Sequence, residues 1–239
     1  YLDGFDADDD WYLYSTSKSI AAYFYVSNNQ ILIGTERLDS AMGVIPSELS
    51  AKVTAARILA SGVAMIWHGL QGNPKFMLDA ARMQAKAKAT IGEEINRHEL
   101  MTNFIFALNR ARQYKSAAQV AELLIKEPVQ ADSIEGLSEA YMATTFNELN
   151  NFARAETLAR AALANFDHPV VAQRGGLELL IALSGLGKKD EAEALMVARN
   201  WKHTPADLLS TVTNQSILHA EALLAMHRDE APYALALMK

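Results

Sequence analysis

At 239 residues, 50% of them hydrophobic, the chain has enough apolar material for one large domain or one array of repeats, and too much for a disordered chain. It has no cysteine, which excludes disulfides, thiolate metal sites and a cysteine nucleophile. The net charge of -6 comes from residues 1–49, and the remainder is balanced. Because no basic stripe is present, nucleic acid is not an expected partner.

Residues 1–49 are acidic and rich in aromatic side chains, and we expect them to form a helical cap ahead of the remaining chain. Their pattern predicts one helix from about Asp10 to Val26 and a second from about Ile31 to Met42. A short polar turn at residues 27–29 separates the two predicted helices.

The acidic start of the chain resembles a calcium-binding loop in one respect only. Asp6, Asp8 and Asp10 alternate like the ligands of an EF-hand. However, Trp11 stands where that loop needs glycine, and Ser17 stands where it needs glutamate. We therefore expect these acids to cap the first helix, where negative charge meets the positive end of the helix dipole.

The segment Tyr14–Lys18 contains two short catalytic patterns. Tyr14 and Lys18 have the Tyr-x-x-x-Lys spacing of short-chain dehydrogenases, and Ser15 with Lys18 has the Ser-x-x-Lys spacing of serine hydrolases related to β-lactamases. The chain lacks the Gly-rich dinucleotide turn of the first class and the Lys-Thr-Gly strand of the second. An enzyme using this cluster is therefore the alternative to a non-enzymatic function. A closed pocket holding Lys18 with Ser15 or Tyr14 would favour it.

From residue 50 onward, polar caps, prolines and glycines divide the chain into a succession of amphipathic helices. The expected helices run from a cap at Ser47 to Leu70, Asn73 to Thr90, Glu93 to Arg112, Tyr114 to Lys126, Asp132 to Leu149, from Phe152 through Leu163, Asp167 to Gly185, Asp190 to Asn200, Thr204 to Met226, and from Asp229 onward. Consecutive helices are joined by short turns, so we expect about five antiparallel hairpins.

Alanines that follow the predicted hairpin turns recur at nearly constant steps. The series is Ala81, Ala117, Ala155, Ala192 and Ala231, with steps of 36, 38, 37 and 39 residues. Such regularity predicts an all-α solenoid of stacked helix hairpins over residues 50–239. A small side chain at each crossing would let neighbouring helices pack closely.

The segment Gly136–Pro169 resembles a tetratricopeptide repeat. Ala143, Phe146, Ala155, Ala162 and the closing Pro169 follow one another in that family's order, although the family's tryptophan is missing and the steps exceed its usual 34 residues. The resemblance covers roughly residues 50–239. It implies a right-handed superhelix whose first helices line a concave groove for a protein or peptide.

The resemblance also places a set of side chains in that groove. The expected groove residues come from the first helices of three consecutive repeats: Thr102, Phe106, Asn109 and Arg110, then Thr144 and Asn147, then Ile181 and Ser184. Asn109 and Asn147 are equivalent and are expected to bind a peptide backbone, with Arg110 contacting a carboxylate. Glu178 lies where the carboxylate clamp of chaperone-binding repeats needs a cation, so chaperone tails are not expected.

Neither a metal, a cofactor nor a membrane span is predicted. The six histidines lack metal-binding spacing, and the longest apolar run, Ile58–Leu70, is short of the roughly 20 residues that a span needs. The sequence thus favours a non-enzymatic interaction scaffold, which could also be the sensor or regulatory region of a larger protein. We expect a soluble chain, in the cytoplasm or exported to the periplasm, because the start at Tyr1 permits a removed leader.

Overall fold

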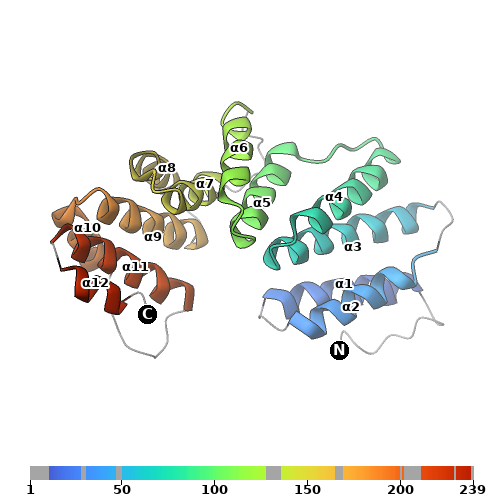
Figure 1. The fold of residues 1–239 in the computed structure, drawn as a ribbon. Helices are drawn as coiled ribbons and strands as arrows, with labels where there is room; N and C mark the ends of the chain where they lie inside the picture. Colours follow the sequence, from blue (N-terminus) through green and yellow to red (C-terminus); the bar gives the residue numbers. More distant parts are fainter. Residues whose placement is uncertain are drawn as a thin grey trace. The chain divides into compact units, whose positions relative to one another are not determined.

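The computed structural model describes residues 11–27, 31–46, 50–127, 136–164, 169–199, 201, 211–228 and 230–237 (Figure 1). Every regular element in these residues is an α-helix, so the all-α prediction is confirmed. The chain divides into two compact units, Tyr1–Gln113 and Tyr114–Lys239, which are described here one at a time.

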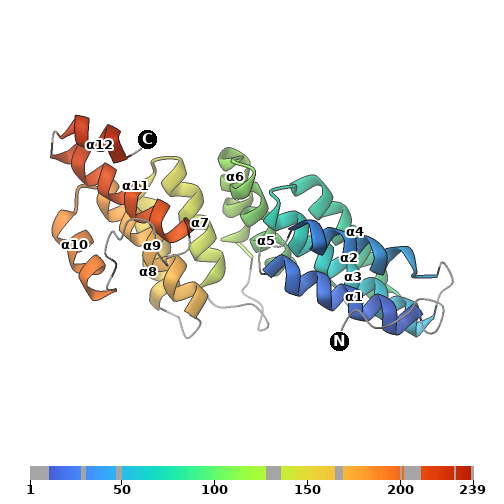
Figure 2. The ribbon, with the colours of Figure 1, turned by 90° about the horizontal axis from the view of Figure 1, so that it is seen from below.

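The first unit contains five described helices arranged around α3 (Figure 2). They are α1 (Trp11–Ser27), α2 (Ile31–Gly43), α3 (Ala51–Leu70), α4 (Pro74–Ala89) and α5 (Arg97–Arg110). The helices α1 and α2 form one antiparallel hairpin and α3 and α4 form the next, while α5 packs against both α3 and α4. The N-terminal pair thus lies directly against the hairpin that follows it.

Local capping explains where two of these helices begin. Ser50 Oγ accepts a hydrogen bond from the Val53 amide at 3.2 Å, so α3 begins at Ala51. The expected cap, Ser47, lies outside the described residues. The predicted start of α5 near Glu93 is wrong, because Asn96 Oδ1 accepts from the Glu99 amide at 2.8 Å and caps the helix there.

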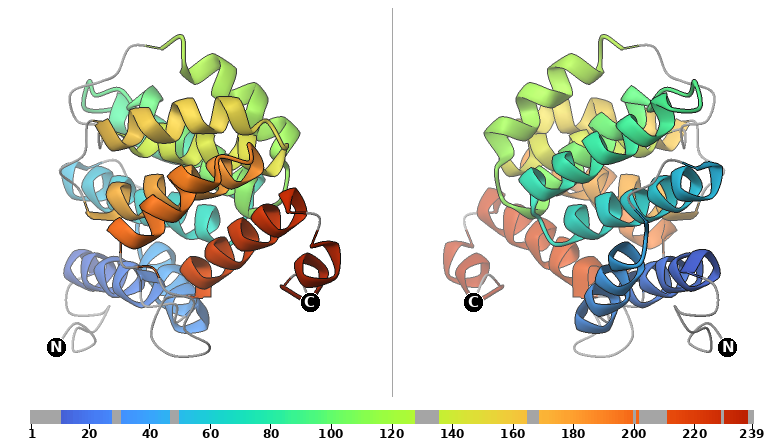
Figure 3. Two further views of the ribbon diagram at one scale, coloured as in Figure 1. Left: turned by 90° about the vertical axis from the view of Figure 1, so that its left-hand side faces the viewer. Right: turned by 90° about the vertical axis from the view of Figure 1, so that its right-hand side faces the viewer.

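The second unit is built around α9. Its described helices are α6 (Tyr114–Leu124), α7 (Leu137–Glu148), α8 (Phe152–Ala164), α9 (Pro169–Gly185), α10 (Lys189–Ala198), α11 (Thr211–His227) and α12 (Ala231–Leu237). Pairs of consecutive helices form hairpins, and α9 also packs against α7 and α11, the first helices of the neighbouring hairpins (Figure 3). The expected caps at Asp132, Asp167, Thr204 and Asp229 lie outside the described residues.

Two glycines let other groups approach α9 closely. A Cβ atom on Gly175 would lie 3.3 Å from Ala162 Cβ, and one on Gly176 would lie 2.9 Å from the ring of Trp201. The side chains from Gly175 to Ser184 are all buried. Contact on nearly every side makes α9 the core helix of this unit.

Four of the turns have the same backbone geometry. Gly72, Arg112, Asn150 and Gly187 all have φ between 56 and 69°. After α7, the Asn151 amide donates to the Phe146 carbonyl at 2.8 Å and the Asn150 amide donates to the Asn147 carbonyl at 2.9 Å, which is the Schellman pattern. The bonds equivalent to the first are Asn73 to His68, Gln113 to Leu108 and Lys188 to Leu183.

The turn geometry corrects the predicted alanine register. In the second helices from α4 onward the fourth residue is at most 3% exposed, and these residues are Met77, Ala117, Ala155, Ala192 and Ala234. The registers at Ala81 and Ala231 are therefore wrong, since Ala81 lies one turn later in α4 and Ala231 is the first residue of α12. The corrected steps are 40, 38, 37 and 42 residues.

One described helix is long and apolar enough to cross a membrane. The stretch Lys52–Leu70 of α3 qualifies, but 56% of it is buried inside the protein. Because α3 contacts each of the other four described helices of its unit, its apolar composition is that of a core helix.

Candidate functional site

The predicted groove residues of the first unit lie on α5, and they differ in exposure. Thr102 and Asn109 are buried, at 5% and 8% exposure, and Thr102 Oγ1 donates to the His98 carbonyl at 2.9 Å. Phe106 is half-buried. Arg110 is exposed, and its Nε donates to the Leu70 carbonyl at 3.2 Å, so this side chain helps to close the end of α3.

In the second unit, the two predicted groove residues of α9 are not open to solvent. Ile181 and Ser184 are 5% and 0% exposed. Ser184 Oγ donates to the Leu180 carbonyl at 2.8 Å within the helix. Their side chains therefore belong to the packed interior of the unit.

Asn147 joins two neighbouring first helices. It is 2% exposed, and its Nδ2 donates to the carbonyl and to Oε2 of Glu178, both at 2.9 Å. The other carboxylate oxygen of Glu178, Oε1, accepts from Thr144 Oγ1 at 2.7 Å. Both amide hydrogens of Asn147 are thus engaged within the protein. The predicted stacking of Asn147 with Asn109 stays a prediction, because the two residues belong to different units.

Arg174 and Tyr141 lie beside the buried Glu178 carboxylate and are partly exposed. The guanidinium carbon of Arg174 lies 5.1 Å from the centre of the Tyr141 ring, and its Nη2 donates to Thr144 Oγ1 at 3.3 Å. Arg174 Nε is 4.0 Å from Glu178 Oε1, and the Arg174 side chain is 26% exposed. Side chains from α7 and α9 therefore share one surface.

The electrostatics of this surface keep Tyr141 neutral. Burial raises the pKa of the Tyr141 hydroxyl above its ordinary value of 10, and the neighbouring Arg174 charge opposes that rise. At neutral pH Tyr141 supplies an aromatic face and a hydroxyl hydrogen bond, but no base. This suits recognition better than proton transfer.

Sequence reasoning missed Tyr141 as a site residue. Its contact with Arg174 spans 33 positions, and the bond between Thr144 and Glu178 spans 34. Both separations are close to the length of one repeat. Polar residues about one repeat apart in the sequence are therefore the signal that could have predicted these contacts.

The Tyr14–Lys18 segment partly meets the condition set for catalysis. Lys18 is 4% exposed, and its Nζ lies 5.2 Å from the centre of the Tyr14 ring. The ammonium group thus lies over the ring of Tyr14. Ser15 is fully buried and its Oγ donates to the Ala41 carbonyl of α2 at 2.9 Å, which ties this hydroxyl to the α1–α2 packing. A buried serine in this arrangement is not presented to a substrate.

Two other findings bear on chemistry. Among the described residues, no three His, Asp or Glu side chains gather into a possible metal site. The described part of the chain also contains no strand on which a dinucleotide-binding sheet could be built.

No protein-family model, curated protein or solved structure matches the chain.

Proposed function

We propose that this chain is a non-enzymatic scaffold of the tetratricopeptide-repeat type that binds a segment of another protein. Three features support the proposal: the shared turn after the first helices α3, α5, α7 and α9, the buried fourth residue of the second helices from α4 onward, and the direct packing of α7 and α11 on α9. Stacked hairpins of this kind form extended binding surfaces. The proposed stack is a right-handed superhelix.

The binding surface that we propose in the second unit consists of Tyr141 and Thr144 from α7 and Val170 and Arg174 from α9. We call it the α7–α9 surface. Val170 is 53% exposed and lies one helical turn before Arg174, on the same side of α9. Tyrosine and arginine are, with tryptophan, enriched at the energetic centres of protein interfaces.

One observation carries the proposal. Arg174 packs over Tyr141 and donates to Thr144, so the neighbouring helices α7 and α9 present an aromatic ring, a cation and a hydroxyl side by side. Glu178, beneath them, is held by Asn147 and Thr144. The surface is thus positioned before any ligand arrives, which lowers the entropic cost of binding.

The test uses the full chain as bait for a library of displayed random peptides. Selected peptides are then measured by fluorescence anisotropy against the wild type, Tyr141→Ala and Arg174→Ala. We expect each variant to weaken binding by roughly tenfold, as for a residue near the centre of an interface.

A matched control comes from the second helix of the same hairpin. Arg160 of α8 is also a partly exposed arginine, and it pairs with Glu156 and Glu191. Arg160→Ala should leave peptide affinity unchanged. Peptides that bind Tyr141→Ala and Arg174→Ala as tightly as the wild type would refute the proposed surface.

A further inference from the structure

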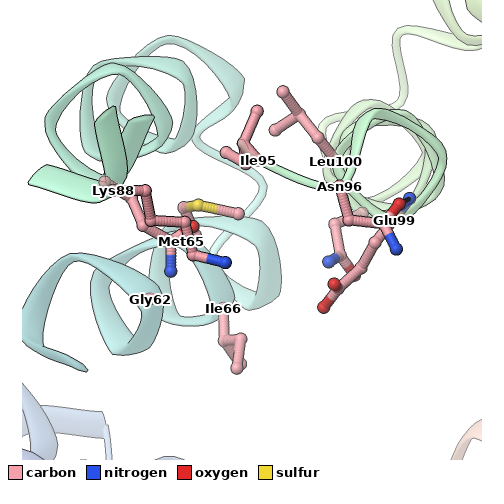
Figure 4. Close-up of a pocket in the computed structure, with 10 residues that line it drawn as sticks. Gly62, Met65, Ile66, Lys88, Ile95, Asn96, Glu99 and Leu100 are labelled. Atoms are coloured by element: carbon pink, nitrogen blue, oxygen red, sulfur yellow. Dashed lines mark hydrogen bonds between the residues drawn. The ribbon is translucent and has the colours of Figure 1, made fainter. Parts of the chain in front are cut away.

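The first unit contains a small pocket where α3, α4 and the start of α5 meet (Figure 4). Its volume is about 130 Å³. This is similar to an engineered cavity of about 150 Å³ that holds benzene. The pocket therefore has room for one small organic group or one side chain of a partner.

Part of the pocket exists because Gly62, which lines it, has no side chain. A Cβ atom on Gly62 would lie 2.9 Å from Gln84 Nε2. Because Gly62 has none, Gln84 lies across α3 and donates to the Ile58 carbonyl at 3.4 Å. Space remains between Gln84 and α5.

The lining combines aliphatic and polar groups. Met65 and Ile66 lie on the α3 side, and Ile95 and Leu100 lie at the start of α5 (Figure 4). These four side chains can contact the methylenes of a ligand. The remaining lining residues are polar: Gln84, Lys88, Asn96, Glu99 and Asn103.

The charges favour a cation on the α5 side. Lys88 is on the α4 side of the pocket, where its Nζ lies 3.8 Å from Glu93 Oε2, so its charge is offset (Figure 4). Glu99 comes from the first turn of α5. Within the described part of the chain, neither the Glu99 carboxylate nor the side-chain amide of Asn103 has an ion pair or hydrogen bond. The charge in the pocket lining that has no protein partner is therefore the negative charge of Glu99.

We propose that this pocket binds an ammonium or guanidinium group carried on a short aliphatic chain. The methylenes contact Met65, Ile66 and Leu100, and the cation is bound by the Glu99 carboxylate and the side-chain amide oxygen of Asn103. A charge-assisted hydrogen bond to the carboxylate supplies the specificity. The cation comes either from a lysine or arginine of a partner protein or from a free alkylamine. This site is independent of the α7–α9 surface.

The experiment follows the methyl NMR signals of Met65, Ile66 and Leu100 in the full chain during titrations. The first arm uses butylammonium and butylguanidinium, with butanol as the neutral control. The second uses a short acetylated peptide with one arginine, with glutamine at that position as control. Saturable shifts with the cations of either arm support the proposal, and the arm with the tighter binding identifies the source.

The variant Glu99→Gln should weaken cation binding by roughly tenfold, as expected for loss of a charge-assisted hydrogen bond. Because Glu99 is exposed, this variant keeps the fold. Glu94 is also exposed and does not line the pocket, so Glu94→Gln should bind like the wild type. Shifts with butanol equal to those with butylammonium, no saturable shift, or unchanged binding to Glu99→Gln would each overturn the proposal.

Discussion

The contact between α3 and α5 in the first unit and that between α7 and α9 in the second use the same turn position differently. Gly69 and Asn147 each lie three residues before the left-handed residue of their turn. A Cβ on Gly69 would lie 3.9 Å from Phe106, so the position faces an apolar side chain of α5. Asn147 instead donates two hydrogen bonds to Glu178 of α9.

The comparison shows that this position faces the next first helix in both units. In the first unit the contact at this position is between apolar groups. In the second unit it is polar and buried, so every donor that is removed leaves an acceptor without its partner. The two contacts should therefore respond in opposite ways to the same substitution.

The largest effect is expected for Asn147→Ala. The Glu178 carboxylate loses a buried donor, and the free energy of unfolding should fall by about 2 to 3 kcal/mol. Gly69→Ala is the matched control. Its new Cβ meets Phe106 at an ordinary contact distance, and alanine favours the helix over glycine by about 0.5 to 1 kcal/mol. Urea unfolding measures the free energy of unfolding of both variants. Equal losses in the two variants would contradict the proposed difference between the two contacts.

The turns provide a second comparison, in which Gly72→Ala is expected to destabilise by about 2 to 3 kcal/mol. The left-handed conformation costs alanine about 1 to 2 kcal/mol, and the added Cβ would also lie 2.9 Å from the backbone of Ala111. Thermal unfolding measures the loss. A melting temperature equal to that of the wild type would mean that this turn and the end of α5 are not in contact.

Ala155→Leu tests the corrected register at the fourth position of the second helices. Ala155 is fully buried, so the larger side chain should overpack the crossing and cost about 2 kcal/mol. The equivalent position in α4 already holds a large residue, Met77, also fully buried. Calorimetry of Ala155→Leu should show a lower melting temperature. An unchanged melting temperature would show that the helix crossing can accommodate leucine and would contradict this register.

The smallest effect has the opposite sign. Arg112 is exposed and has φ of 56°, so Arg112→Gly should stabilise the protein by about 0.5 to 1 kcal/mol, once the greater freedom of glycine in the unfolded chain is subtracted. Asn150→Gly should gain less, because asparagine tolerates the left-handed region. Urea unfolding that ranks the two variants in the reverse order would contradict this reading of the turns.

Periodicity and capping signals were enough to predict the helices. Most ends lie within a few residues of the predictions, because Pro74, the Asn150–Asn151 turn and the glycine at 187 act locally. The error at the start of α5 arose because two acids at residues 93–94 resemble a first turn. The Asn96 side chain decides that start instead.

The site was harder to predict, for a physical reason. The repeat spacing in the sequence predicted that Asn147 is equivalent to Asn109, but it could not give the direction of the Asn147 side chain. That direction depends on Glu178, which lies 31 residues away and whose carboxylate needs donors once it is buried. The pocket beside Gly62 was also not foreseen, since it results from the absence of a side chain in one helix and the start of another.

We propose that Asn147 holds α7 and α9 together while Tyr141 and Arg174 face the ligand. The most direct test is the NMR spectrum of the side-chain N–H groups in the full chain, with and without a selected peptide. We predict that the Asn147 amide hydrogens exchange slowly with solvent and do not shift, whereas the Arg174 Nη–H groups shift on binding, because Nε of that side chain is buried. Rapid exchange of the Asn147 amide, together with a peptide-induced shift as large as that of Arg174, would show that Asn147 is open to the ligand and would contradict its role between the helices.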